Sequence, residues 1–75
     1  MTATVQSVER AIRILKSFNL EKPERRVNEL GRELGLHKST VSRLMATLES
    51  QGLLVRNLET DRYRLGIDLI GLAAQ

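Results

Sequence analysis

The chain has 75 residues, of which 41% are hydrophobic, and its formal net charge is +3. This length suits one small domain with a single core. The chain contains no cysteine and one histidine, His37, so disulfides, Cys-based zinc sites and a histidine metal cluster are excluded. No run approaches the roughly 18 apolar residues of a membrane span, and the start lacks the pattern of a secretory signal. We therefore expect no cofactor and no membrane contact, and the mild basicity is a weak indication of a polyanionic partner.

The first half of the chain predicts two helices joined by a charged segment. Residues 1–4 are expected to form a disordered N-terminus. Ser7 is a good N-cap, and apolar residues at helical spacing predict a first helix from about 7 to 20. These apolar residues are Val8, Ala11, Ile12, Leu15 and Phe18. The segment 21–26 holds the only proline and five charged residues, so it is interpreted as a solvated loop.

The remaining elements are predicted from helix-capping residues, from glycines and from the alternation of apolar and polar residues. Val27 is expected to pair briefly with later strands, and Asn28 to cap a second helix that Gly35 ends. A third helix is predicted from near His37 to Gln51. Its inward residues are Val41, Leu44, Met45 and Leu48. Segments 54–56 and 62–65 are typical of two strands joined by the polar turn 57–61, and a last, rather apolar helix follows Gly66.

The segment 27–44 meets the steric demands of two helices that cross steeply through a tight turn. Two leucines form the buried face of the first of these helices, and a glycine between them allows the second helix to pass closely. A second glycine permits the turn. One apolar residue fills the corner of the turn, and two more pack the second helix against the core. These positions are Leu30, Gly31, Leu34, Gly35, Leu36, Val41 and Leu44. A plain helical hairpin is the alternative, but the strand hairpin that follows favours a winged helix-turn-helix.

The outward side of the third helix carries short hydroxyl side chains and two cations. Its members are Lys38, Ser39, Thr40, Ser42, Arg43, Ala46, Thr47 and Ser50. Short side chains allow a helix to enter a DNA major groove about 12 Å wide, and the forked donors of Arg43 match guanine O6 and N7. Ser39 and Thr40 lie in the first turn, where the helix dipole favours a phosphate. The alternative is an ordinary solvated helix face, which usually carries more glutamate.

Further cations flank this helix in the predicted structure. Arg62 and Arg64 alternate with Tyr63 and Leu65, so a strand would present both arginines on one face, where they suit phosphate or minor-groove contact. A charged, solvated edge strand is an equally good interpretation. Arg25 and Arg26 precede the second helix and could reach a flanking phosphate, although loop arginines are most often simply solvated.

These residues together resemble the IclR family of bacterial regulators. The resemblance rests on QSVERAIRILKSF, on VNELGRELGLHKSTVSRLMATLESQGLL and on the later YRLG. It implies a mainly α-helical winged helix-turn-helix over 5–66, with the helix-turn-helix at about 25–44 and a two-stranded wing at about 53–66. Residues 67–75 would then begin a linker helix to a C-terminal effector-binding domain that this sequence lacks.

The resemblance also implies the partners and the biological role. Family members are usually cytoplasmic homodimers or tetramers, with DNA-binding domains that touch through their first helix. They bind palindromic or near-palindromic operators and respond to a small effector through the C-terminal domain. The function predicted from the residues is sequence-specific binding of double-stranded DNA to control transcription, whether as repressor or activator. A winged-helix protein-interaction module is the alternative, and an enzyme is disfavoured because no nucleophile–base pair, metal cluster or phosphate-cradling loop is present.

Overall fold

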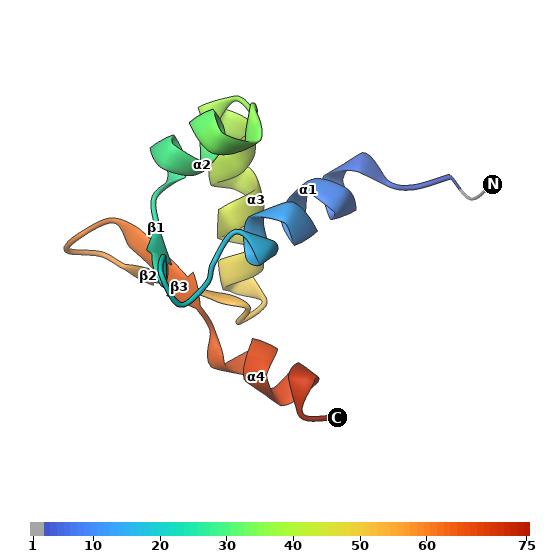
Figure 1. The fold of residues 1–75 in the computed structure, drawn as a ribbon, viewed down its shortest axis with the longest axis vertical. Helices are drawn as coiled ribbons and strands as arrows, with labels where there is room; N and C mark the ends of the chain where they lie inside the picture. Colours follow the sequence, from blue (N-terminus) through green and yellow to red (C-terminus); the bar gives the residue numbers. More distant parts are fainter. Residues whose placement is uncertain (1–2) are drawn as a thin grey trace.

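A computed structural model describes residues 3–75 of the chain. In chain order the elements are α1 (Gln6–Lys16), β1 (Glu24–Arg25), α2 (Val27–Leu34), α3 (Lys38–Ser50), β2 (Leu54–Asn57), β3 (Arg62–Leu65) and α4 (Ile67–Ala73). Helix α3 runs through the middle of the molecule, and α1 crosses it while the sheet lies to one side (Figure 1). The mainly helical winged helix-turn-helix predicted from the sequence is confirmed. Residues 3 and 4 precede α1 without helix or strand, and residues 1–2 of the predicted disordered N-terminus lie outside the described residues.

Helix α1 is shorter than predicted, and it faces the core differently. It begins after Val5, so Ser7 lies inside the helix and is not its N-cap. The helix ends at Lys16 because the Asn19 side chain accepts hydrogen bonds from the backbone N–H groups of Glu21 and Lys22, both at 2.9 Å, which favours a turn. Val8 and Ile12, two of the apolar residues whose spacing predicts this helix, are exposed, whereas Ile14 is fully buried.

The sheet has three strands, which are the two predicted strands of the wing, β2 and β3, and a short additional strand, β1. Strand β3 is central and pairs antiparallel with β2 on one side and with β1 on the other. The expected pairing of Val27 is therefore wrong, because Glu24 and Arg25 form β1 while Val27 already belongs to α2. The predicted solvated loop 21–26 thus ends in a strand, whose pairing partner comes from the distant part of the chain.

The core forms where α3 meets α1, α2 and the sheet. Its buried apolar residues are Ile14, Phe18, Leu30, Val41, Met45, Leu48, Leu54 and Tyr63. Three of these come from one side of α3, as its 3.6-residue period predicts. Leu44, also predicted to point inward, is partly buried and packs against this cluster. The position of α3 is therefore set from one side, and its other side is left to solvent.

Two glycines shape the junction between α2 and α3 as predicted. Gly35 ends α2 in the left-handed conformation, with φ of 69°, which is readily available to glycine. Gly31 is buried, and a Cβ atom built there would lie 3.1 Å from the Leu36 carbonyl oxygen and 4.0 Å from the Lys38 Cα. The Leu36 backbone N–H donates to the Gly31 carbonyl at 3.0 Å. Because glycine has no side chain, the turn can press directly against α2.

Arg25 is buried, which corrects the expectation that it is solvated or reaches DNA. Only 2% of its surface is exposed, and its guanidinium donates to three groups. Nε donates to the Glu29 carboxylate at 2.8 Å, Nη1 to the Ser17 carbonyl at 2.6 Å, and Nη2 to the Glu33 carboxylate. A buried charge requires such partners, so these contacts tie the end of α1, β1 and α2 into one unit.

The start of α2 differs in detail from the sequence prediction. Arg26, not Asn28, is the residue that precedes the helix, and its backbone N–H donates to the Glu29 carboxylate at 3.1 Å. The hydrogen bond from Arg25 is the main cause that lowers the pKa of Glu29, and the bond from Arg26 adds to it. Glu29 thus stays ionised beside the first turn of α2, where negative charge is favourable.

A substitution at Gly31 tests the close approach of α2 and the turn. Gly31→Leu should lower the free energy of unfolding by about 1–3 kcal/mol, because the side chain would force Leu36 and Lys38 away from α2. Urea denaturation followed by circular dichroism measures this. Gly71→Ala is the matched control, because a Cβ at Gly71 meets no atom within 4 Å. Wild-type stability of Gly31→Leu would mean that the helices are not packed as described.

A second substitution tests the buried guanidinium. Arg25→Met should lower the free energy of unfolding by about 1–3 kcal/mol, because two carboxylates and one carbonyl lose their donor. The carboxylates of Glu29 and Glu33 are nearly half exposed and can be hydrated once Arg25 is lost. We therefore expect a smaller loss of stability than the removal of one partner from a fully buried ion pair would cause. Arg26→Met, which changes an exposed neighbour, should have little effect in the same denaturation experiment.

The ion pair between Arg25 and Glu29 predicts that the stability of the domain depends on pH. The pKa of Glu29 is lowered in the folded state, so its contribution to stability is present above the unfolded value of about 4.3 and is lost as the pH falls through the folded value. The stability difference between wild type and Arg25→Met should therefore be largest near neutral pH and shrink in acid. A difference that does not change with pH would show that the Arg25–Glu29 pair does not contribute in this way.

Candidate nucleic-acid interface

The outward side of α3 is open to solvent along the whole helix. The residues predicted to face outward and found exposed are Lys38, Ser39, Ser42, Arg43, Ala46, Thr47 and Ser50, while Thr40 is half-buried. The inward residues Val41 and Met45 are fully buried between them. This side carries no carboxylate before Glu49, in the last turn. An exposed helix side with small side chains and two cations has the shape and charge that a DNA major groove admits.

The hydroxyls near the end of this side are partly satisfied within the helix. Thr47 Oγ1 donates to the Arg43 carbonyl at 2.9 Å, and Ser50 Oγ donates to the Thr47 carbonyl at 2.6 Å. Their donor hydrogens are thus committed, but their oxygens can still accept. Lys38 and Arg43 form no ion pair among residues 3–75, so both cations are available to an external anion.

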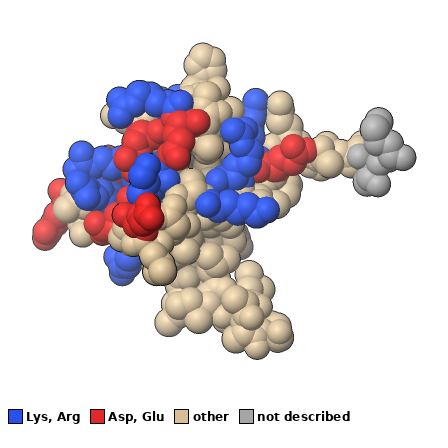
Figure 2. Space-filling view, in the orientation of Figure 1, with Lys and Arg blue, Asp and Glu red and all other residues tan. Residues whose placement is uncertain are grey.

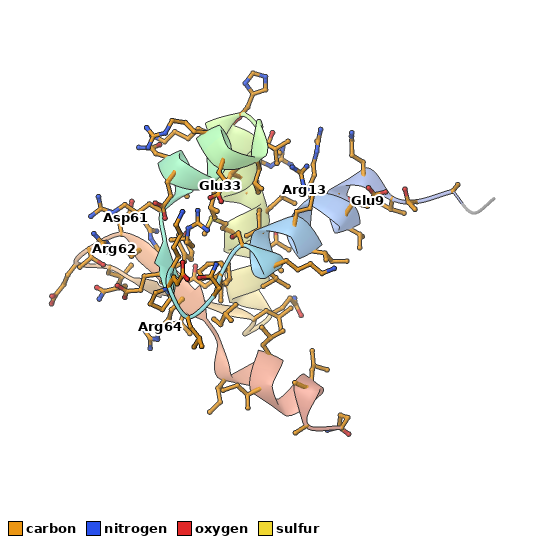
Figure 3. The ribbon with its side chains drawn as sticks, in the orientation of Figure 1. Glu9, Arg13, Glu33, Asp61, Arg62 and Arg64 are labelled. Atoms are coloured by element: carbon orange, nitrogen blue, oxygen red, sulfur yellow. The ribbon has the colours of Figure 1, made fainter. Side chains whose placement is uncertain are left out.

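The central strand separates its arginines from its aromatic residue, as alternation predicts. Tyr63 is buried in the core, whereas Arg62 and Arg64 are exposed on the sheet, where both are marked in Figure 3. Leu65 was expected on the Tyr63 side but is 41% exposed, because the strand ends there and the chain turns away into α4. Arg62 Nη1 lies 3.9 Å from Glu24 Oε1, a weak, solvated pair, and Arg64 has no carboxylate partner among the described residues.

The wing turn holds its acidic residue against a cation of the sheet. Asp61 adopts a left-handed φ of 61°, which aspartate tolerates better than most residues. Its carboxylate accepts from Arg56 Nε at 2.8 Å, and this bond is the main cause that raises the pKa of Arg56 above its ordinary value. The Arg56 guanidinium also lies 5.9 Å from the centre of the Tyr63 ring. The negative charge of Asp61 at the turn is thereby partly neutralised.

The start of α2 brings together cations that are distant in sequence. Arg26 and Lys38 line one groove with Thr60 and Asp61 of the wing turn, so the beginnings of α2 and α3 face the wing across it. A second groove beside it is lined by Arg26, Arg32 and Arg62, together with Asn28, Glu24 and Glu29. Sequence reasoning overlooked Arg32, because only the folded sheet places it near Arg62.

Sequence reasoning also missed two residues of α1. Ser7 and Arg10 line a groove with the α3 residues Thr40, Arg43, Leu44 and Thr47. Ser7 was interpreted as a helix cap, and Arg10 was not considered. No local pattern signals this groove, because it arises from the angle at which α1 crosses α3. The outward side of α3 is therefore bordered by α1 on one flank and by the wing on the other.

Charged residues are unevenly distributed over the molecule. Lysine and arginine gather over α1, α2 and the sheet with acidic side chains between them, whereas the end formed by α4 shows no charge on this face (Figure 2). Across residues 3–75, no three His, Asp or Glu side chains group so that they could hold a metal ion. Over the same range, no helix has the length and apolar character required to cross a membrane.

Comparisons with known proteins match this geometry. The model of the IclR helix-turn-helix domain matches residues 7–58. The HTH-type transcriptional regulator XynR of Escherichia coli (strain K12) is 41% identical over 66 residues, which are 88% of this chain and 26% of that protein. An IclR transcriptional regulator from Alicyclobacillus acidocaldarius has a solved structure with a TM-score of 0.92 and 33% identity, covering 96% of this chain and 29% of its own.

A further solved structure is similar to the chain in both fold and sequence. The IclR family transcriptional regulator from Brucella abortus has a TM-score of 0.89 and 30% identity, and the match covers 92% of this chain and 26% of that protein. The chain thus spans about a quarter of the length of these regulators. The family model covers more than half of the chain, and the structural matches include α1, the helix-turn-helix and the wing. The chain therefore belongs to the IclR family of transcriptional regulators, and it carries their helix-turn-helix domain.

Proposed function

We propose that this domain binds double-stranded DNA in a sequence-specific manner, with α3 in the major groove, and so controls bacterial transcription. The observation that carries the proposal is the free outward side of α3, from Lys38 to Ser50, which is small, hydroxyl-rich and cationic. The helix is held only from its opposite side, by Val41, Met45 and Leu48. It can therefore enter a groove without any rearrangement of the core.

The proposed contacts divide into base readers and phosphate contacts. Arg43 lies one turn into α3 and has the donor geometry that matches guanine, so we assign it to base recognition. Ser39, Thr40, Ser42 and Thr47 offer further polar contacts on the same side. Lys38 with Arg26 at the wing groove, and Arg62 with Arg64 on the sheet, are assigned to backbone phosphates. The pairing of Asp61 with Arg56 supports this, because it weakens the repulsion that the wing turn would exert on DNA.

Membership of the family supports a proposal for the biological setting. We propose that the intact regulator is a homodimer or tetramer that binds a palindromic or near-palindromic operator, because closed symmetric oligomers present two copies of such a helix to two half-sites. We further propose that α4 begins the connection to a C-terminal domain that binds a small effector. Bacterial operators lie in the cytoplasm, and this function places the protein there.

Substitution of Arg43 tests the assignment of base recognition. Arg43→Ala should weaken operator binding by about 1–3 kcal/mol and relax the preference at one base position, because a bidentate base contact is lost. In vitro selection from a random duplex pool, followed by fluorescence anisotropy, measures both effects. Lys38→Ala is the contrasting variant, which should weaken binding to all sequences alike. If Arg43→Ala kept both the affinity and the base preference of the wild type, the assignment would be wrong.

Retention of the wild-type domain on immobilised duplex DNA tests the function itself. The domain should bind random-sequence DNA at low ionic strength and elute as salt is added, because phosphate contacts release counterions. A winged helix that docks only other proteins would pass through the column unretained. That outcome would replace DNA binding by the protein-interaction function.

A further inference from the structure

We propose that Ser7 and Arg10 of α1, together with Thr40 of α3, form a binding site for one backbone phosphate of the DNA, beside the base-reading Arg43. The site lies on the flank of α3 away from the wing. This inference rests on the proposed function and extends it, because it gives α1 a direct role in holding the duplex. The chemistry recognised is a phosphodiester, which accepts hydrogen bonds from guanidinium and hydroxyl groups.

The first observation is the groove between α1 and α3. Ser7 and Arg10 line it from α1, and Thr40, Arg43, Leu44 and Thr47 line it from α3. Two guanidinium groups and three hydroxyl groups thus share one hollow, and no carboxylate lines it. Glu9, marked on α1 in Figure 3, is next to Arg10 in sequence but is not among the lining residues. The groove is therefore positive, and the hydroxyls of Ser7 and Thr40 add donors to it, while Thr47 donates to the Arg43 carbonyl.

The second observation is that neither arginine has an internal partner. In the described part of the chain, the ion pairs involve Arg25, Arg56 and Arg62, and neither Arg10 nor Arg43. By contrast Arg13, one turn further along α1, donates to the Leu34 carbonyl at 3.2 Å and so serves the packing of α1 on α2. Because Arg43 is assigned to a base, Arg10 is the unpaired guanidinium of this groove that can bind a phosphate, and the charge of Arg43 beside it adds to the attraction for an anion.

The third observation is the position of the groove relative to the wing. Lys38 faces the wing groove, and Thr40 faces the α1 groove. With 3.6 residues per turn, these two residues point about 200° apart around α3. The outward side of α3 lies between them. A helix lodged in the major groove has a sugar–phosphate backbone on each flank, so the wing side would meet one strand and the α1 side the other.

The exposed apolar residues of α1 lie elsewhere on that helix. Val8 and Ile12 are 54% and 44% exposed, and Ile12 is about 200° around the helix from Arg10. A second copy of the domain could cover Val8 and Ile12 without covering Arg10. Contact between subunits and contact with the phosphate are therefore compatible on one helix.

The test compares Arg10→Gln with Lys16→Gln, which removes the same charge from the exposed last turn of α1. Binding of the full chain is measured over a range of salt on two probes, a duplex obtained by in vitro selection and a random-sequence duplex. Arg10→Gln should weaken binding to both probes by the same factor, and the slope of log K against log salt should become shallower by about 0.9, the value for one phosphate. Lys16→Gln should keep the wild-type slope. Arg10→Lys should largely restore it, and thermal melting checks that every variant is folded.

Three results would overturn the inference. One is a wild-type slope in folded Arg10→Gln, and another is an equal change in Lys16→Gln, which would indicate a general effect of charge. The third is a loss confined to the selected duplex, which would make Arg10 a base reader. In each case wild-type binding remains, so the proposed function stands. A wild-type chain that binds neither probe would overturn both proposals.

Discussion

The structure depends on the one-sided burial of α3. Val41 and Met45 are fully buried and Leu48 nearly so, because α1, α2 and the sheet all converge on the same side of this helix. Apolar burial supplies most of the free energy of folding, so this contact decides where α3 lies and which side it presents. Everything proposed for DNA is a consequence: the side that does not enter the core is the side that carries hydroxyls and cations. A helix packed on two sides could not perform this role.

The buried Arg25 side chain connects the end of α1 to α2 by hydrogen bonds, in addition to the contacts of the apolar core. The Arg25 guanidinium bonds to the carbonyl of Ser17, after α1, and to the carboxylates of Glu29 and Glu33 on α2. Since Arg25 itself lies in β1, next to the central strand, the same group also relates both helices to the wing. Such clusters need complete pairing to be tolerated, and among residues 3–75 no buried side-chain nitrogen or oxygen lacks a partner. The cluster therefore fixes the angle between the helix-turn-helix and the wing, which the proposed phosphate contacts require.

Much of the site could be predicted because it lies on one continuous helix. The period of α3 separates Val41 and Met45 from Ser42 and Arg43 whatever the rest of the chain does, and all the positions expected to face outward are exposed except Thr40, which is half-buried. The roles of Gly31 and Gly35 could also be predicted, since a tight turn between two helices imposes local steric demands. The side of α1 that packs into the core could not be predicted from the sequence. That helix has apolar residues on several sides, and Ile14 rather than Ile12 is buried because of where α3 and α2 lie.

The sequence determined most of the local elements, the turn between α2 and α3, and the chemistry of the outward side of α3, because each of these depends on residues close together in the chain. Only the tertiary structure decided that Arg25 is a buried partner of carboxylates, that Glu24 and Arg25 add a third strand, and that Ser7 and Arg10 border Arg43. These features join residues separated by up to about forty positions. Whether an arginine is solvated, buried or poised at a groove depends on what the fold brings beside it, and no local pattern contains that information.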